Sequence, residues 1–343
     1  MRRAVLLLSA AVLVLSACGG PAEENERAGS TTPSAAASVL PATDSPTPTD
    51  SPTPEIRTDY DLPPYGELVK IYDYNTSEPL GYKVTAKERR GKATMYYIEY
   101  RSSGYSVPAY LVMPDGEGPF PAVLYAHGYM VGPTWFVPDA LALAREGYAG
   151  LLIQYPGSRE PYVSFASCDA RSDIEGNVQY VVDLRRGLDL LETLPEIDAE
   201  RIGFIGHSLG AGVGGILTGL EGNRIDAFVI MDGGAYTSED MMEGCGHLPD
   251  EERLRYQERI AVLNPANYVG HDRGAALLFQ LSSDASDPDL PTTEWELVEL
   301  APEPKTLIEY EDYDHLFGCY DFTLCDPSLP PYVDHRAWLQ KNV

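Results

Sequence analysis

Basic residues are scarce in this chain of 343 residues, which has 25 Lys and Arg against 52 Asp and Glu and a formal net charge of −27. Nucleic acids and anionic membrane surfaces would be repelled by this charge, so the composition argues against both as partners. An acidic surface mainly keeps a protein soluble, and it does not by itself identify a cationic substrate.

The amino end has an apolar run, Ala4 to Val14, that is too short for a transmembrane helix, which needs about 20 apolar residues. The run follows Met1-Arg2-Arg3 and precedes Leu15-Ser16-Ala17-Cys18. This pattern resembles a bacterial lipoprotein signal peptide, and the resemblance implies cleavage before Cys18 and lipid on its thiol. We therefore expect a signal peptide over 1–17 and an exported protein, lipid-anchored to the outer face of the bacterial cell membrane. The alternatives are an uncleaved anchor, or secretion with Cys18 incidental.

Apolar residues are also sparse from 18 to 57, where Pro, Ser, Thr, Ala and Gly predominate. Such a segment cannot bury enough apolar surface to offset the entropy lost on ordering, so it predicts a flexible tether. The folded domain is expected over 58–343. Its only predicted contact with the membrane is through the lipid anchor.

Cysteine is rare, with 5 in the chain, and four remain after Cys18. An even number in an exported domain predicts two disulfides, and four cysteines allow three connectivities. The expected one closes a short loop between Cys319 and Cys325 and leaves Cys168 with Cys245. Zinc binding is the rival, but the sequence has no C-x-x-C and no H-E-x-x-H. It also lacks G-x-x-x-x-G-K-[ST], so we expect neither a metal nor an organic cofactor.

Strand-like and helix-like runs alternate from Tyr60 onward, an order that predicts an α/β fold with a mostly parallel sheet and helices on both faces. Two stretches, 156–175 and 233–268, interrupt the alternation. Both follow strands, so we expect them to form the rim of a pocket at the carboxyl edge of the sheet. The expected strands are 95–100, 107–113, 122–126, 148–155, 226–231, 275–280 and 305–310, and the expected helices are 139–146, 177–194 and 332–341.

The apolar run Arg201 to Ile205 leads into Gly206-His207-Ser208-Leu209-Gly210 and then a small-residue helix. A G-x-S-x-G motif between a strand and a helix holds serine in a strained turn with its hydroxyl exposed. Ser208 is therefore the candidate nucleophile, and the alternative is a serine that only caps a helix.

A serine nucleophile needs a base, a carboxylate that orients the base, and donors for the oxyanion. His315 is the candidate base among six histidines, because it follows the last strand in a loop. The loop after Phe279-Gln280 has Asp284, Asp287 and Asp289. We expect Asp287 to be the acid, with Asp284 as its rival. The predicted oxyanion donors are the amides of Leu209 and Tyr129, the latter after His127-Gly128.

These motifs resemble the α/β-hydrolase superfamily, and within it dienelactone-hydrolase-like and acylpeptidase-like serine hydrolases. The run Asp287-Pro288-Asp289-Leu290-Pro291 is similar to the acid loop of such enzymes, as Val107 to Pro114 is to their opening strands. Dienelactone hydrolases proper use cysteine where this chain has Ser208, so the resemblance does not imply lactone chemistry. It covers about Tyr96 to the carboxyl end and does not identify the substrate.

The sequence therefore predicts an exported serine esterase that cleaves carboxylic esters of small-molecule or acylated substrates through an acyl-enzyme. An exopeptidase or amidase with the same triad is the first alternative, and a non-catalytic surface binding lipoprotein is the second. Four loop aromatics are candidates for the pocket wall: Trp135, Phe136, Tyr162 and Phe165. The first two could equally belong to the core.

Overall fold

The structure is a computed structural model that describes residues 61–129, 131–161, 167–234, 245–271, 274–283, 293–319 and 325–343. The predicted signal peptide, Cys18 and the tether lie outside these residues, as do Asp284, Asp287, Tyr162 and Phe165. The account below concerns the folded unit that ends at Val343.

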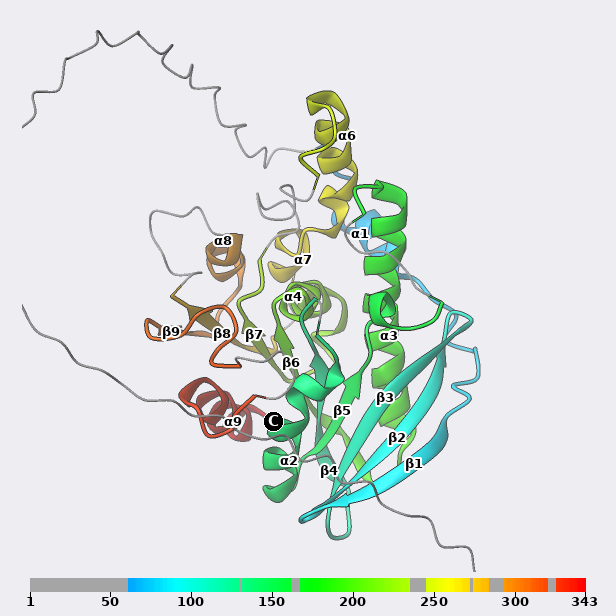
Figure 1. Cartoon of the computed structure of the whole chain (residues 1–343), viewed down its shortest axis with the longest axis vertical. Helices are drawn as coiled ribbons and strands as arrows, with labels where there is room; N and C mark the ends of the chain where they lie inside the picture. Colours follow the sequence, from blue (N-terminus) through cyan, green and yellow to red (C-terminus); the bar gives the residue numbers. More distant parts are fainter. Residues whose placement is uncertain are drawn as a thin grey trace, which may run out of the picture. The chain divides into compact units, whose positions relative to one another are not determined.

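A nine-stranded sheet forms the centre of the described chain, in the order β1-β2-β3-β5-β4-β6-β7-β8-β9 (Figure 1). The first three strands and β5 pair antiparallel, and from β5 to β9 all pairs are parallel. The strands are β1 Lys83–Arg90, β2 Ala93–Ser102, β3 Tyr105–Pro114, β4 Phe120–Ala126, β5 Ala149–Ile153, β6 Ile197–His207, β7 Ala227–Met231, β8 Ala276–Ser282 and β9 Lys305–Tyr310.

Helices cover both faces of the sheet, and each face has its own apolar cluster. Alternate residues of one strand point to opposite faces, so Phe204 of β6 packs in the cluster with α3 and α4 while Ile205 packs in the cluster with α2 and α9. The helices are α1 Tyr65–Leu68, α2 Val137–Arg145, α3 Ala170–Thr193, α4 Leu209–Glu221, α6 Asp250–Ile260, α7 Ala266–Val269, α8 Thr293–Leu300 and α9 Pro330–Asn342.

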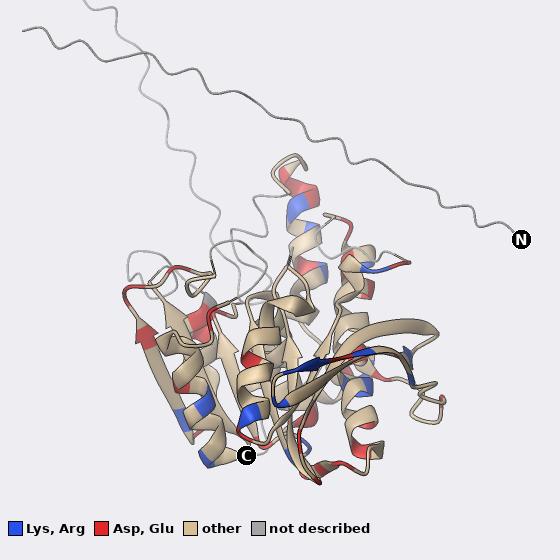
Figure 2. Cartoon of the chain, turned by 60° about the horizontal axis from the view of Figure 1, so that its bottom comes forward, with Lys and Arg blue, Asp and Glu red and all other residues tan. Residues whose placement is uncertain are grey.

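Charged residues lie on the helices, the loops and the exposed edge strands, as the red and blue segments in Figure 2 show. Strands β4, β5, β7 and β8 contain no charged residue, and β5 and β7 are buried along their whole length. Strands buried on both faces are typical of a parallel sheet between helical layers, which explains their continuous apolar runs. The expected mostly parallel α/β sheet is therefore present.

The structure differs from the expectation at the edge strand and in the two interruptions. Strand β1 was not expected, because its residues are exposed and mostly polar or charged. Helix α3 begins at Ala170, inside the first interruption, where the Asp169 side chain accepts a hydrogen bond from the Ser172 amide as its N-cap. The second interruption, expected to be irregular, contains α6 and α7.

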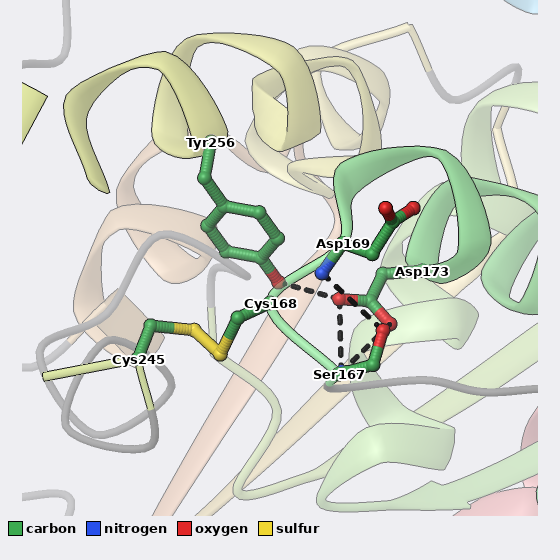
Figure 3. The surroundings of a disulfide bond; sticks show 6 residues. All are labelled: Ser167, Cys168, Asp169, Asp173, Cys245 and Tyr256. Atoms are coloured by element: carbon green, nitrogen blue, oxygen red, sulfur yellow. Dashed lines mark hydrogen bonds between the residues drawn. A yellow bond between two sulfur atoms is a disulfide. The ribbon is translucent and has the colours of Figure 1, made fainter. Parts of the chain in front are cut away.

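The two interruptions are joined to each other by a covalent and a polar link (Figure 3). A disulfide joins Cys168 to Cys245. Beside it, the buried carboxylate of Asp173 accepts hydrogen bonds from the Ser167 amide and hydroxyl and from the Tyr256 hydroxyl, the last at 2.9 Å. Segments that are 77 residues apart in the chain are thus held together.

The second disulfide joins Cys319 to Cys325, only 6 residues apart. Both disulfides have the pairing expected from the sequence. The second one follows the loop of His315, and both of its cysteines are buried.

Removing the long-range disulfide should cost more stability than removing the short one. A crosslink restricts the unfolded chain more when it closes a longer loop. For the separations of 77 and 6 residues, this predicts losses of about 4 and about 2 kcal/mol in the free energy of unfolding. We expect this order for Cys168→Ser with Cys245→Ser against Cys319→Ser with Cys325→Ser, measured by urea unfolding. Equal losses would contradict the loop-entropy explanation.

Candidate active site

Ser208 occupies a strained turn between β6 and α4. Its φ of 55° and ψ of −119° lie in a region that residues with a Cβ rarely adopt. The turn is held by the Ser208 amide, which donates to the Met231 carbonyl at 2.9 Å, and by the Ser208 carbonyl, which accepts from the Gly212 amide at 2.9 Å. The strand, turn and helix expected around this serine are therefore present.

Glycine at two positions lets the strand and the helix come this close. A Cβ on Gly206 would lie 2.4 Å from the Gly210 carbonyl oxygen, and a Cβ on Gly210 would lie 2.0 Å from the Ala126 carbonyl oxygen. These obstacles are backbone atoms that cannot turn aside. The glycines of the G-x-S-x-G motif are thus required by packing.

His315 lies in the loop after β9 and reaches Ser208. Its Nε2 is 2.9 Å from the Ser208 Oγ, a hydrogen-bonding distance. Its side chain is 44% exposed, so the imidazole is partly accessible to solvent. The structure thus brings together two residues that are 107 positions apart in the sequence.

The carboxylate of Asp232 lies on the other side of this imidazole. Its Oδ2 is 3.3 Å from His315 Nδ1, and the side chain is fully buried. Its Oδ1 accepts a hydrogen bond of 2.8 Å from the Ser282 amide, and its own amide donates to the Gln280 carbonyl at 3.0 Å. Asp232 is therefore held between the ends of β7 and β8, facing the His315 imidazole.

The sequence analysis did not select Asp232. The predicted acid, Asp287, and its rival Asp284 lie outside the described residues, so their positions stay predictions. A signal for Asp232 was available, because Met231-Asp232-Gly233 puts an aspartate at the carboxyl end of a buried strand next to β6. Its φ of 44° is one that aspartate tolerates better than most residues.

The loop after β4 packs directly against the elbow. A Cβ on Gly128 would lie 3.3 Å from the Ser208 Cβ, so a side chain at this position of the loop would crowd the serine. Leu209 is the first residue of α4, where amides have no partner inside the helix. The assignment of Leu209 and Tyr129 as oxyanion donors stays a prediction. The Tyr129 ring is 47% exposed and lies edge-on to Tyr155.

Trp135 and Phe136 belong to the core, which was the alternative to a place in the pocket wall. Both are about 1% exposed, and the Trp135 ring stacks on His207 with centroids 5.2 Å apart. They lie in the short 3-10 helix Pro133–Phe136 before α2. Trp135 therefore supports the elbow from within, while Phe136 packs against Tyr125.

Two further histidines of the site are buried and held neutral. Burial lowers the pKa of His127 to about 4, although its contact with the Gly128 carbonyl opposes this shift. Burial, together with the nearby His315, lowers the pKa of His207 to about 3. Both imidazoles are therefore uncharged at neutral pH.

The described part of the chain has no group of three or more His, Cys, Asp or Glu placed to hold a metal ion. The chemistry available from the described side chains is that of an alcohol, an imidazole and a carboxylate in sequence. A series of contacts from carboxylate to imidazole to alcohol makes the alcohol nucleophilic.

A scan of the chain against protein-family models finds no match. Solved structures do match it over most of its length. An acetyl xylan esterase from Paenibacillus sp. is 18% identical, with a TM-score of 0.62, over 81% of this chain and 93% of that one. Acetyl xylan esterase 1 from Thermoanaerobacterium sp. is 15% identical, with a TM-score of 0.64 and the same coverage.

A peptidase-related structure is also similar to this chain. It is a putative dipeptidyl aminopeptidase IV from Bacteroides ovatus, 16% identical with a TM-score of 0.55, matched over 73% of this chain and 36% of that one. At these identities the likeness concerns the fold alone. Together with the sheet described above, it shows that the chain has the α/β-hydrolase fold.

Acid should destabilise the protein through His207. An unfolded histidine titrates near 6.5, whereas burial lowers the pKa of His207 to about 3 in the folded chain. Between these values the unfolded chain binds a proton that the folded chain does not, so the free energy of unfolding decreases as the pH falls. This effect alone removes about 2 kcal/mol by pH 5.

We expect His207→Gln to weaken this pH dependence, because glutamine does not titrate. The measurement is the free energy of unfolding by urea at intervals from pH 7 to pH 5. His247→Gln is the matched control, because His247 is exposed and lies far along the chain from the elbow. If the free energy of unfolding falls equally with pH in the wild type and in His207→Gln, His207 is not the source of this pH dependence.

Proposed function

We propose that this protein is an exported serine hydrolase that cleaves carboxylic esters. The observation that carries the proposal is the contact series from Ser208 through His315 to Asp232, at 2.9 and 3.3 Å, on the carboxyl edge of an α/β-hydrolase sheet. The solved esterases of the same fold add support at the level of the reaction class. The substrates we propose are small esters or acylated molecules.

In the proposed reaction the Ser208 Oγ attacks the ester carbonyl carbon while His315 Nε2 takes its proton. The carbonyl electrons move onto the oxygen, which the Leu209 and Tyr129 amides are proposed to hold. The tetrahedral intermediate then collapses, and His315 returns the proton to the departing alkoxide. Water repeats the sequence on the acyl-enzyme and releases the carboxylic acid.

Asp232 has a defined part in this cycle. A carboxylate at Nδ1 fixes the tautomer that leaves Nε2 free to accept a proton, and it stabilises the imidazolium that forms. Because the Asp232 side chain is fully buried, solvent screens this interaction little. We therefore propose Asp232 as the acid, and Asp287 and Asp284 as the alternatives that the assay below separates.

The second candidate function is an exopeptidase or amidase that uses the same residues. The match to a dipeptidyl aminopeptidase-like structure favours keeping it. Ester and amide hydrolysis share the nucleophile and the base, so the substrate distinguishes them. Turnover of aminoacyl nitroanilides in preference to p-nitrophenyl esters would assign the peptidase function instead.

The test is hydrolysis of p-nitrophenyl acetate and butyrate by the purified domain, with a fluorophosphonate probe as an active-site label. We expect turnover by the wild type and stoichiometric labelling on Ser208. Ser208→Ala should lose the label and turnover, by about 10⁶-fold in kcat for a nucleophile of this class. Labelling elsewhere would refute the proposal, and so would a wild-type protein that neither reacts nor turns over, as a binding lipoprotein would.

The same assay assigns the acid. Asp232→Asn should lower kcat by about 10⁴-fold, because the amide favours the wrong imidazole tautomer. Asp287→Asn and Asp284→Asn are the matched controls, and each should stay within a few-fold of the wild type. A larger loss of kcat in Asp287→Asn or Asp284→Asn than in Asp232→Asn would place the acid after β8 and leave Asp232 as a structural residue.

We also propose that the protein is a lipoprotein anchored through Cys18 after removal of residues 1–17. The support is the sequence pattern alone: a positive start, a short apolar run and a small-residue segment that ends in cysteine. The tether over 18–57 would then hold the hydrolase domain away from the membrane.

Cys18→Ala should abolish lipidation and release the domain from membranes. The measurement is incorporation of radiolabelled fatty acid in a bacterial host, followed by fractionation. We expect label in the wild type and none in the variant, with unchanged ester turnover in both. A wild-type protein that incorporates no fatty acid would remove the anchor from the proposal.

A further inference from the structure

The side chain of His207 is buried beside the catalytic residues, although the proposed reaction does not use it. It is 3% exposed, and its Nε2 is 2.7 Å from the backbone carbonyl oxygen of His315. A carbonyl oxygen can only accept, so Nε2 carries the proton and donates. The imidazole of the elbow thus bonds to the backbone of the base.

The rest of the ring is fixed by packing. Trp135 stacks on one face with an interplanar angle of 11°, and Phe317 meets the ring edge-on with centroids 6.0 Å apart. The buried Nδ1 atom has no hydrogen-bond partner among the residues that the structure describes, and a Cβ on Gly128 would lie 3.2 Å from it. The ring is therefore wedged between the loop of the base and the loop of the predicted oxyanion donors.

We propose that His207 is a positioning residue for the catalytic base: its Nε2–H holds the His315 backbone so that the His315 imidazole meets Ser208. This inference rests on the proposed function. Two adjacent elbow residues then bond the same histidine. The His207 Nε2 contacts the backbone carbonyl of His315 at 2.7 Å, and the Ser208 Oγ contacts the His315 Nε2 at 2.9 Å. The two contacts fix both the place and the direction of the imidazole.

The loop that carries His315 is also anchored at a second point, so the two contacts hold different parts of the loop. The Ser283 amide and hydroxyl both donate to the Tyr313 carbonyl at 2.8 Å, two residues before His315. This anchor holds the start of the loop, and residue 315 itself needs a further contact to its own backbone. The carbonyl that faces His207 supplies that contact.

A neutral ring also suits the reaction. When His315 takes the serine proton it becomes a cation, with its ring centroid 5.0 Å from that of His207. A second charge at this distance would oppose that step. The burial that keeps His207 uncharged removes this repulsion, while Nε2–H remains a donor.

The test compares His207→Gln, which can place an N–H near the position of Nε2, with His207→Leu, which fills similar space without a donor. Both lose the stack on Trp135, so both should lower the melting temperature by similar amounts. The leucine variant should lose more catalysis than the glutamine variant. We expect its kcat on p-nitrophenyl esters to fall about five- to tenfold with KM within twofold, and the glutamine variant to recover most of that loss.

The pH profile of kcat and the rate of fluorophosphonate labelling complete the test. For His207→Leu we expect labelling to slow in parallel with kcat and the acid limb of the profile to shift, because the imidazole of His315 is displaced. His207→Met serves as a second donor-free variant if leucine does not fold.

Equal losses of kcat in the leucine and glutamine variants, or an unchanged kcat in the leucine variant, would overturn the positioning role. Failure of the proposed function gives a different result, because the wild type then shows no ester turnover. In that case the positioning role is refuted as well.

Discussion

The strained turn at Ser208 is the constraint on which the rest of the site depends. A positive φ in a non-glycine residue is unfavourable, and the structure maintains it through the Met231 carbonyl, the Gly212 amide and the close approach of β6 to α4. The same approach brings the β4 loop against the serine. The nucleophile, the predicted oxyanion loop and the central strands are therefore parts of one packed unit.

The residues around this turn come from three strand ends. In a parallel sheet these ends lie at one edge, so β6 supplies Ser208, β7 supplies Asp232 and the loop after β9 supplies His315. The disulfide and the Asp173–Tyr256 hydrogen bond then join the two segments expected to form the rim at this edge. A rigid sheet places the chemistry, and two crosslinks limit how far those segments can separate.

The sequence was most informative where burial alone decides the structure. Strands such as β7 are continuous apolar runs, so they were predicted almost to the residue. Strand β1 is exposed and charged, and α6 has a polar sequence in which only Tyr256 and Ile260 are buried, so neither has a strong apolar pattern. Asp232 was not selected for a different reason: the run from Asp287 to Pro291 resembles the acid loop of such hydrolases, and this resemblance directed attention to the loop after β8.

His207 shows what sequence patterns cannot supply. The G-x-S-x-G motif leaves its second position open, and nothing in the spacing says where that side chain points. Only the fold reveals that it lies between Trp135 and the carbonyl of His315. A phenylalanine could fill this space but could not donate, and a lysine could donate but would bring a charge next to the base. A buried, neutral imidazole meets both requirements, because burial itself suppresses the charge while leaving one N–H available. The physical environment of the elbow thus selects the protonation state on which the proposed role depends.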